Sequence, residues 1–243
     1  MEQLTDLADC RLIQGCLYCG ATPKTREHVP SRILLQKPFP ENLPVMPACA
    51  ECNNSYSLDE EYVACVLGCM LSGTTEPHLI KNPRVSKALA RKPALRTQIE
   101  QSKVTGHDGI SFRFDDKRFL NIIQKLAVGH AAFELSLVFR DKPTKLNWKF
   151  ISSMSDEELD EFDAAHVTVL LGEVGCRNIQ RMYVLEALLK SPTGELVKKA
   201  LIVNDWVDVQ DGVYRYHALH SNEGVTIKII LNEYIACEVF WDY

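Results

Sequence analysis

Residues 16–20, 25–31 and 41–61 of this chain read CLYCG, TREHVPS and ENLPVMPACAECNNSYSLDEE. These segments hold two Cys-x-x-Cys pairs, Cys16/Cys19 and Cys49/Cys52. Zn²⁺ prefers four soft or borderline ligands in a tetrahedron, and a Cys-x-x-Cys turn can place two thiolates on one ion. The spacing therefore predicts a single structural zinc on all four cysteines. The alternative is four buried or unpaired thiols.

The segment between the two pairs is too short and too rich in proline to bury a core of its own. Metal binding would then supply most of its folding free energy. A site closed by four thiolates has no open position for a substrate, so the predicted zinc builds structure and takes no part in chemistry. Any reaction must use other residues of the same segment.

Three residues beside the cysteines have the chemistry of a phosphodiesterase. Hydrolysis of a phosphodiester needs a base to activate water and a cation to neutralise charge on the leaving oxygen. His28 has a suitable pKa for the base. The carboxylate of Glu27 and the amide oxygen of Asn53 suit Mg²⁺ or a similar hard ion, and Glu60 is a further candidate ligand. Taken singly, each residue is more often structural, as a surface pair or a helix cap, and the interpretation as a site depends on their combination beside the cysteines.

The order of these residues resembles the HNH, or ββα-metal, endonucleases of the zinc-containing type. The matching features are an acid-His pair ahead of a proline, then an Asn-Leu, then a Cys-x-x-Cys followed directly by Asn. In this chain they are Glu27-His28-Val29-Pro30, Asn42-Leu43 and Cys49-Ala50-Glu51-Cys52-Asn53. The resemblance covers about residues 12–65, and Glu27 stands where Asp is commoner in the family.

The resemblance implies a role for each of these positions. His28 would be the general base, and Glu27 and Asn53 would hold a catalytic Mg²⁺ or Mn²⁺. Asn42 would orient the loop and hold His28 in place. The expected activity is metal-dependent hydrolysis of DNA, in defence or restriction. Two alternatives are an RNA nuclease and a non-catalytic zinc module that binds nucleic acid or protein.

The remaining sequence predicts an α+β chain in three parts. Residues 1–75 form the zinc-stabilised ββα-metal module, 76–105 a basic helical connector broken at Pro93, and 106–243 a domain with antiparallel strands. The connector is basic enough to grip phosphates, although a solvated helical face is the commoner fate of such runs. Its candidate nucleic-acid contacts are Arg84, Lys87, Arg91, Lys92 and Arg96.

The C-terminal part matches no motif, and we expect it to carry a homodimer contact or a partner-protein contact. Its alternating apolar residues and turn signals predict several strands. The predicted strands cover residues 167–171, 181–188, 197–203, 213–219, 225–231 and 235–241.

Bulk composition excludes some classes of protein. The formal net charge is −5, so a nucleic-acid surface must be a local patch. No apolar run is long enough to cross a membrane. The acidic N-terminus lacks the features of a secretory signal, and nine cysteines without such a signal favour reducing cytoplasm.

One local pattern leaves the start of the helix after Cys52 open between two positions. Ser57-Leu58-Asp59-Glu60 matches a capping box, which would begin a helix at Ser57. The zinc knuckle would instead begin the helix near Asn53. The sequence alone is compatible with both starts.

Overall fold

The computed structural model describes residues 14–106, 109–172, 176–192 and 194–243. These residues form the predicted α+β architecture. The α-helices are α1 (Ala50–Ser72), α2 (Pro83–Arg91), α3 (Pro93–Gln101), α4 (Asp116–Leu135), α5 (Asp156–Asp163) and α6 (Arg177–Arg181). Short 3-10 turns lie at Arg32–Leu34, Pro77–Leu79 and Ile151–Ser153.

The strands form four antiparallel groups. A hairpin joins β1 (Thr25–His28) to β2 (Val45–Ala48), and a second joins β3 (Lys103–Gly106) to β4 (Gly109–Phe112). The main sheet has the order β5-β12-β11-β10-β9, with bounds Lys145–Phe150, Ile235–Asp242, Gly224–Leu231, Tyr214–Ser221 and Val207–Gln210. The last group has the order β6-β8-β7, with bounds His166–Val167, Leu196–Asn204 and Tyr183–Lys190.

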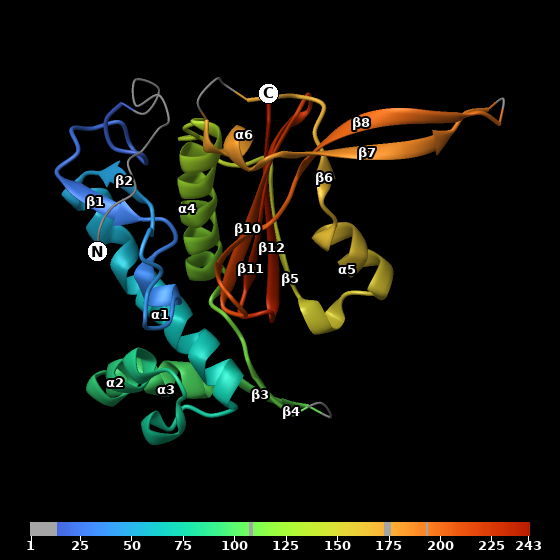
Figure 1. The fold of residues 1–243 in the computed structure, drawn as a ribbon. Helices are drawn as coiled ribbons and strands as arrows, with labels where there is room; N and C mark the ends of the chain where they lie inside the picture. The colour runs from blue at the N-terminus through green and yellow to red at the C-terminus, as the bar shows by residue number, and fades with distance from the viewer. Residues whose placement is uncertain (1–13, 107–108, 173–175, 193) are drawn as a thin grey trace.

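Helix α4 lies between the N-terminal hairpin and the main sheet, and α1 runs from the hairpin toward α2 and α3 (Figure 1). Helix α1 packs on α4, and α4 packs on β10, β11 and β12. Both helices have long runs of buried apolar residues, so one hydrophobic cluster extends from Leu17 to Trp241. The division at residues 75 and 105 stays a prediction about independent folding units. None of the helices in the described residues is both long enough and apolar enough to span a lipid bilayer.

Helix α1 begins at the second Cys-x-x-Cys pair, where the zinc knuckle was expected. Cys49 is its N-cap, and its Sγ accepts a hydrogen bond from the backbone N–H of Cys52. Ser57 lies within the helix, where its hydroxyl donates to the carbonyl of Asn54. The knuckle therefore sets the start of the helix, and the capping pattern at Ser57 does not.

Local residues also set the ends of other helices. Pro93 separates α2 from α3 as expected. Asp115 caps α4, and Ser155 with Glu158 forms a full capping box on α5. After α4, strands β5 and β9 have no counterpart among the predicted strands, and the strand expected at 167–171 ends at Val167.

Helices α1 and α2 make a close approach at Gly68. A Cβ at this position would lie 2.8 Å from Cγ1 of Val85. We therefore expect Gly68→Ala to lower the free energy of unfolding by about 1–3 kcal/mol through overpacking, although alanine favours helix. Denaturant unfolding measures this change, with the exposed Ser57→Ala on the same helix as control. A Gly68→Ala protein as stable as Ser57→Ala would contradict the close packing.

Candidate functional site

The four cysteines of the two knuckles meet in one cluster. Their Sγ atoms all lie within 4.8 Å of one another, and the Sγ atoms of Cys19 and Cys49 are 3.7 Å apart. Sulfurs at about 2.3 Å from one tetrahedral ion are about 3.8 Å apart, so this spacing suits zinc. Hydrogen bonds from Gly20 N–H to the Cys16 carbonyl and from Cys16 N–H to the Ala21 carbonyl close the first knuckle.

The four thiols influence one another's ionisation. Burial opposes ionisation of Cys16, but hydrogen bonds from backbone N–H groups, that of Cys49 first, lower its pKa to about 7. Burial and the neighbouring thiols raise the pKa of Cys52. Four thiolates cannot remain ionised together without a compensating positive charge. The donor set therefore fits a structural metal such as zinc, which would join the hairpin to the start of α1.

The β1–β2 hairpin sends Glu27 and His28 to opposite faces, as expected for adjacent residues on a strand. In the register, Glu27 pairs with Met46 and His28 with Val45. Glu27 and Met46 are buried on the face toward α1. His28 is half-buried on the other face, where burial and then the positive charge of Arg32 lower its pKa.

Glu27 lies in a buried ionic cluster with Glu60, Ser31 and Lys125. The Lys125 ammonium is 2.9 Å from Glu27 Oε1 and 2.8 Å from Ser31 Oγ. It also pairs with Glu60 of α1, whose carboxylate accepts from the Ser31 hydroxyl. The Lys125 side chain is only 1 % exposed. Two carboxylates from distant parts of the chain thus converge on one cation, which here is an ammonium group.

Asn53 lies on the same face of α1 as Glu60 but nearer the start of the helix. Its side-chain N–H donates to Thr25 Oγ1 at 3.2 Å, and Thr25 donates in turn to the Ala48 carbonyl. Thr25 and Glu27 share a face of β1, and Asn53 and Glu60 share a face of α1. The structure therefore brings Glu27 and Glu60 to the same Lys125 ammonium group, while Asn53 bonds to Thr25 on β1.

Asn42 lies in the loop before β2. It lines a hollow of about 160 Å³ together with Arg177 and Arg181 of α6 and with Tyr216. Within the described residues it makes no hydrogen bond to His28, so its orienting role stays a prediction.

Most of the candidate nucleic-acid residues gather in one groove. The groove has a volume of about 380 Å³ and lies between α2 and α1; its basic lining residues are Arg84, Lys87, Arg91 and Lys92. Lys92 is paired with Glu61 in the groove wall. Arg96 lies on α3 and pairs with Glu76 instead.

Lys125 and Ser31 were missed by the sequence reasoning. Lys125 interrupts the apolar stripe of α4, with Ile122 one turn before it and Leu126 directly after it. A lysine in such a stripe is almost never fully buried unless it is paired with an acid. That signal was available and pointed to a buried ion pair, although it did not name Glu27 or Glu60.

Comparison of the chain with family models, with curated proteins and with solved structures finds no match in any of the three.

Proposed function

We propose that this chain is a metal-dependent endonuclease of the HNH type that hydrolyses phosphodiester bonds of DNA. The observation that carries the proposal is the arrangement of the hairpin around the cysteine cluster. An acid faces the following helix, and the adjacent histidine faces outward beside Arg32. Reaction at a phosphate needs both a cation site and a base that solvent can reach.

His28 acts as the base in this proposal. Its lowered pKa keeps the imidazole neutral near pH 7, so it can take a proton from the attacking water. Arg32 beside it supplies positive charge toward the phosphate. The groove lined by Arg84, Lys87 and Arg91 would hold the nucleic-acid backbone through contacts that weaken with salt.

The carboxylates of Glu27 and Glu60 fit a hard divalent ion by their chemistry, because both already converge on one cationic atom. When bound, Mg²⁺ or Mn²⁺ would supply positive charge for the leaving 3′ oxygen. The ion would lie on the buried face of the hairpin, opposite His28, so the ion and the base can act on one phosphate only if β1 bends between Glu27 and His28. Glu27 and Glu60 would hold the ion, whereas Asn53 lies about two helical turns before Glu60 on the same face of α1 and bonds to Thr25. Lys125 competes for the same oxygens, so metal binding to the wild-type protein should be weak.

A second candidate is a non-catalytic zinc module that binds nucleic acid or protein. The observation that favours it is the buried Lys125, which already neutralises the acid pair without any metal. In that case the cluster holds α4 against the hairpin and serves stability alone.

Plasmid cleavage separates the two candidates. We expect the full chain to nick or linearise DNA in Mg²⁺ or Mn²⁺. The cleavage rate of His28→Ala should be about 10²–10⁴-fold lower, because the base is removed. Gel analysis of the products measures the rate, and a single-stranded RNA substrate in parallel tests the RNA alternative.

The matched control is His78→Ala, which removes an exposed histidine remote in sequence from the hairpin. Circular dichroism and zinc content should be unchanged in both variants. A His28→Ala protein that cuts as fast as His78→Ala would remove the proposed base. A wild-type chain without metal-dependent cleavage of either nucleic acid would favour the zinc module.

A further inference from the structure

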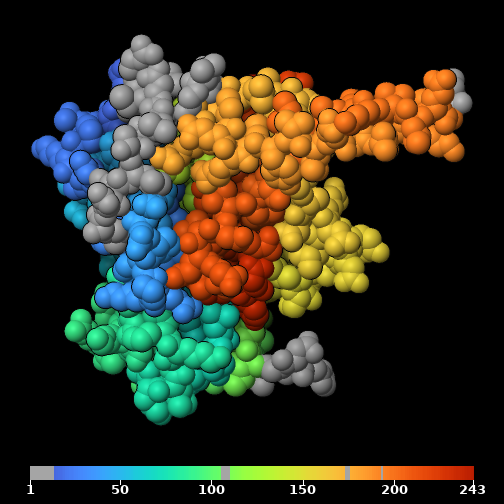
Figure 2. All heavy atoms as spheres, viewed as in Figure 1, coloured from blue at the N-terminus to red at the C-terminus, as the bar shows by residue number. Residues whose placement is uncertain are grey.

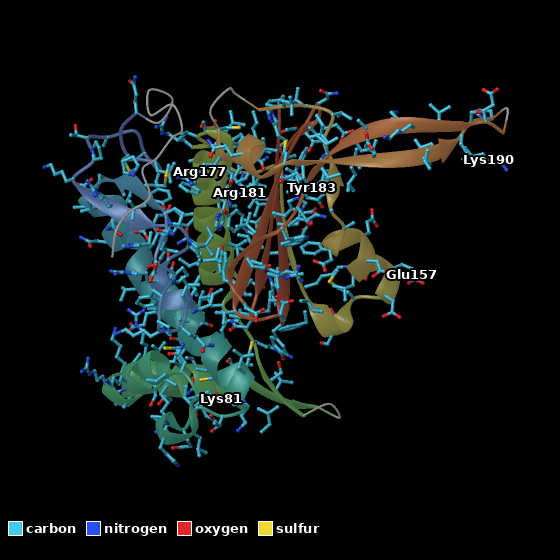
Figure 3. All side chains as sticks on the ribbon, viewed as in Figure 1. Lys81, Glu157, Arg177, Arg181, Tyr183 and Lys190 are labelled. Carbon is cyan, nitrogen blue, oxygen red and sulfur yellow. The ribbon has the colours of Figure 1, made fainter. Side chains whose placement is uncertain are left out.

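Strands β7 and β8 form an arm that extends away from the rest of the protein. Figure 2 shows this arm projecting without cover from other elements, and Figure 3 places Tyr183 at its base and Lys190 near its tip. The strands pair from Tyr183↔Val203 to Lys190↔Leu196. A two-stranded ribbon alone is marginally stable in water, so its position in solvent requires an explanation.

The arm is apolar on both faces. Seven of its apolar side chains are 41–69 % exposed: Tyr183, Val184, Leu185, Leu188, Leu189, Leu196 and Val197. Such a concentration of exposed apolar side chains is unusual on a soluble protein and marks an interaction site.

The edge of the arm is open on the β7 side. In the described residues β8 pairs with both β6 and β7, whereas β7 has only β8 as a strand neighbour. An open edge presents unpaired backbone N–H and C=O groups to another strand. Strand β8 carries Lys198 and Lys199 but no acidic residue between Leu196 and Asn204, so a second copy of β8 would offer these lysines no partner of opposite charge.

The charges of β7 complement those of its own copy. We propose that two copies of this chain associate by antiparallel pairing of their β7 edges about a two-fold axis at Leu188. In this register Glu186 lies opposite Lys190 of the second copy, and Lys190 lies opposite its Glu186. The two Leu188 side chains meet at the axis, and on the other face Leu189 lies opposite Ala187 of the second copy. A two-fold interface must be self-complementary in this way.

Shifting the axis by two residues toward the base or the tip of the arm shows why Leu188 is favoured. An axis at Glu186 or at Lys190 would place two like charges in contact, which destabilises a strand pair. The existing partner of Glu186 is Lys198, and both side chains of this pair are more than 60 % exposed. The pair therefore does not prevent Glu186 from meeting a second lysine.

A charge-swap experiment with the full chain tests the register. Sedimentation velocity should find the wild type as a dimer. Glu186→Lys and Lys190→Glu should each weaken dimerisation roughly tenfold or more, because each replaces two attractive pairs with two repulsive ones. An equimolar mixture of the two variants should dimerise again. In the mixed dimer, the lysine introduced at position 186 of one chain would face the glutamate introduced at position 190 of the other.

The matched control is Glu157→Lys, the same change of charge on α5, away from the arm (Figure 3). It should leave the dimer intact. A monomeric wild type would overturn the proposal and leave the arm to a different partner protein. A dimer that survives both arm variants, or variants that fail to recover on mixing, would overturn the β7 register. Mass is the readout, so these outcomes are independent of nuclease activity.

Discussion

Chelation of zinc, or the substitution Cys49→Ser, is expected to unfold the β1–β2 hairpin and the first turns of α1. Structural zinc supplies on the order of 10 kcal/mol of binding free energy in small zinc modules, as much as the whole stability of many domains. Cys49 has two functions, because its Sγ belongs to the cluster and also caps α1. We expect about one zinc per chain in the wild type and a large loss of thermal stability without it.

Near-UV circular dichroism is a suitable measurement, because the rings of Tyr18 and Tyr56 lie 5.0 Å apart beside the cluster. Cys65→Ala is the matched control, since Cys65 is buried in the same helix outside the cluster. It should keep its zinc and lose about 1 kcal/mol. A protein that contains no zinc, or a Cys49→Ser variant as stable as Cys65→Ala, would contradict the structural metal.

The cysteine cluster was predictable because its information is local. Each Cys-x-x-Cys turn places two thiolates by itself, and only the meeting of the two turns depends on the fold. The caps at Asp115 and Ser155 were predictable for the same reason, since a cap bonds to a backbone N–H three residues later. The opposite faces of Glu27 and His28 followed from the geometry of any strand.

The buried ionic cluster around Lys125 was not predictable, because its members are far apart in sequence. Lys125 is 98 residues from Glu27 and 65 residues from Glu60. Their contact depends on the packing of α4 against both α1 and the hairpin, which no local pattern specifies.

The burial of the β7–β8 arm was not predictable for a different reason. The apolar pattern of β7 and β8 predicts strands that are half-buried, yet both faces remain in solvent.

Replacement of Lys125 with methionine is the second change with a large expected effect. The substitution keeps most of the aliphatic stem and removes the ammonium, so it leaves Glu27 and Glu60 buried without their counter-ion. Loss of one partner from a buried ion pair costs about 3–5 kcal/mol. Denaturant unfolding at neutral pH should show a loss of this size, while Lys117→Met, on the exposed side of the same helix, should change stability by less than about 0.5 kcal/mol.

The pH dependence of this loss has a definite sign. Burial already raises the pKa of Glu27 above its ordinary value, although Lys125 opposes the rise. Without Lys125 the pKa of Glu27 must rise further, because the positive charge that lowers it is gone while burial and the nearby Glu60 carboxylate still disfavour the charged form. A carboxyl with a raised folded-state pKa stabilises the folded protein at low pH, and this contribution is lost as the pH rises through that pKa. The difference between Lys125→Met and wild type should therefore shrink from pH 8 toward pH 5.

Divalent ions then reveal whether the acid pair is a metal site. In Lys125→Met the two carboxylates have no competing ammonium, so Mg²⁺ or Mn²⁺ should bind more tightly than in the wild type. A ligand at 100 times its dissociation constant stabilises the folded state by about 2.7 kcal/mol, which would recover much of the loss. Adding Glu60→Gln to Lys125→Met should abolish this rescue while relieving part of the charge repulsion. Rescue of the same size in the double variant would place the ion elsewhere, and no rescue in Lys125→Met would mean that Glu27 and Glu60 hold only the lysine.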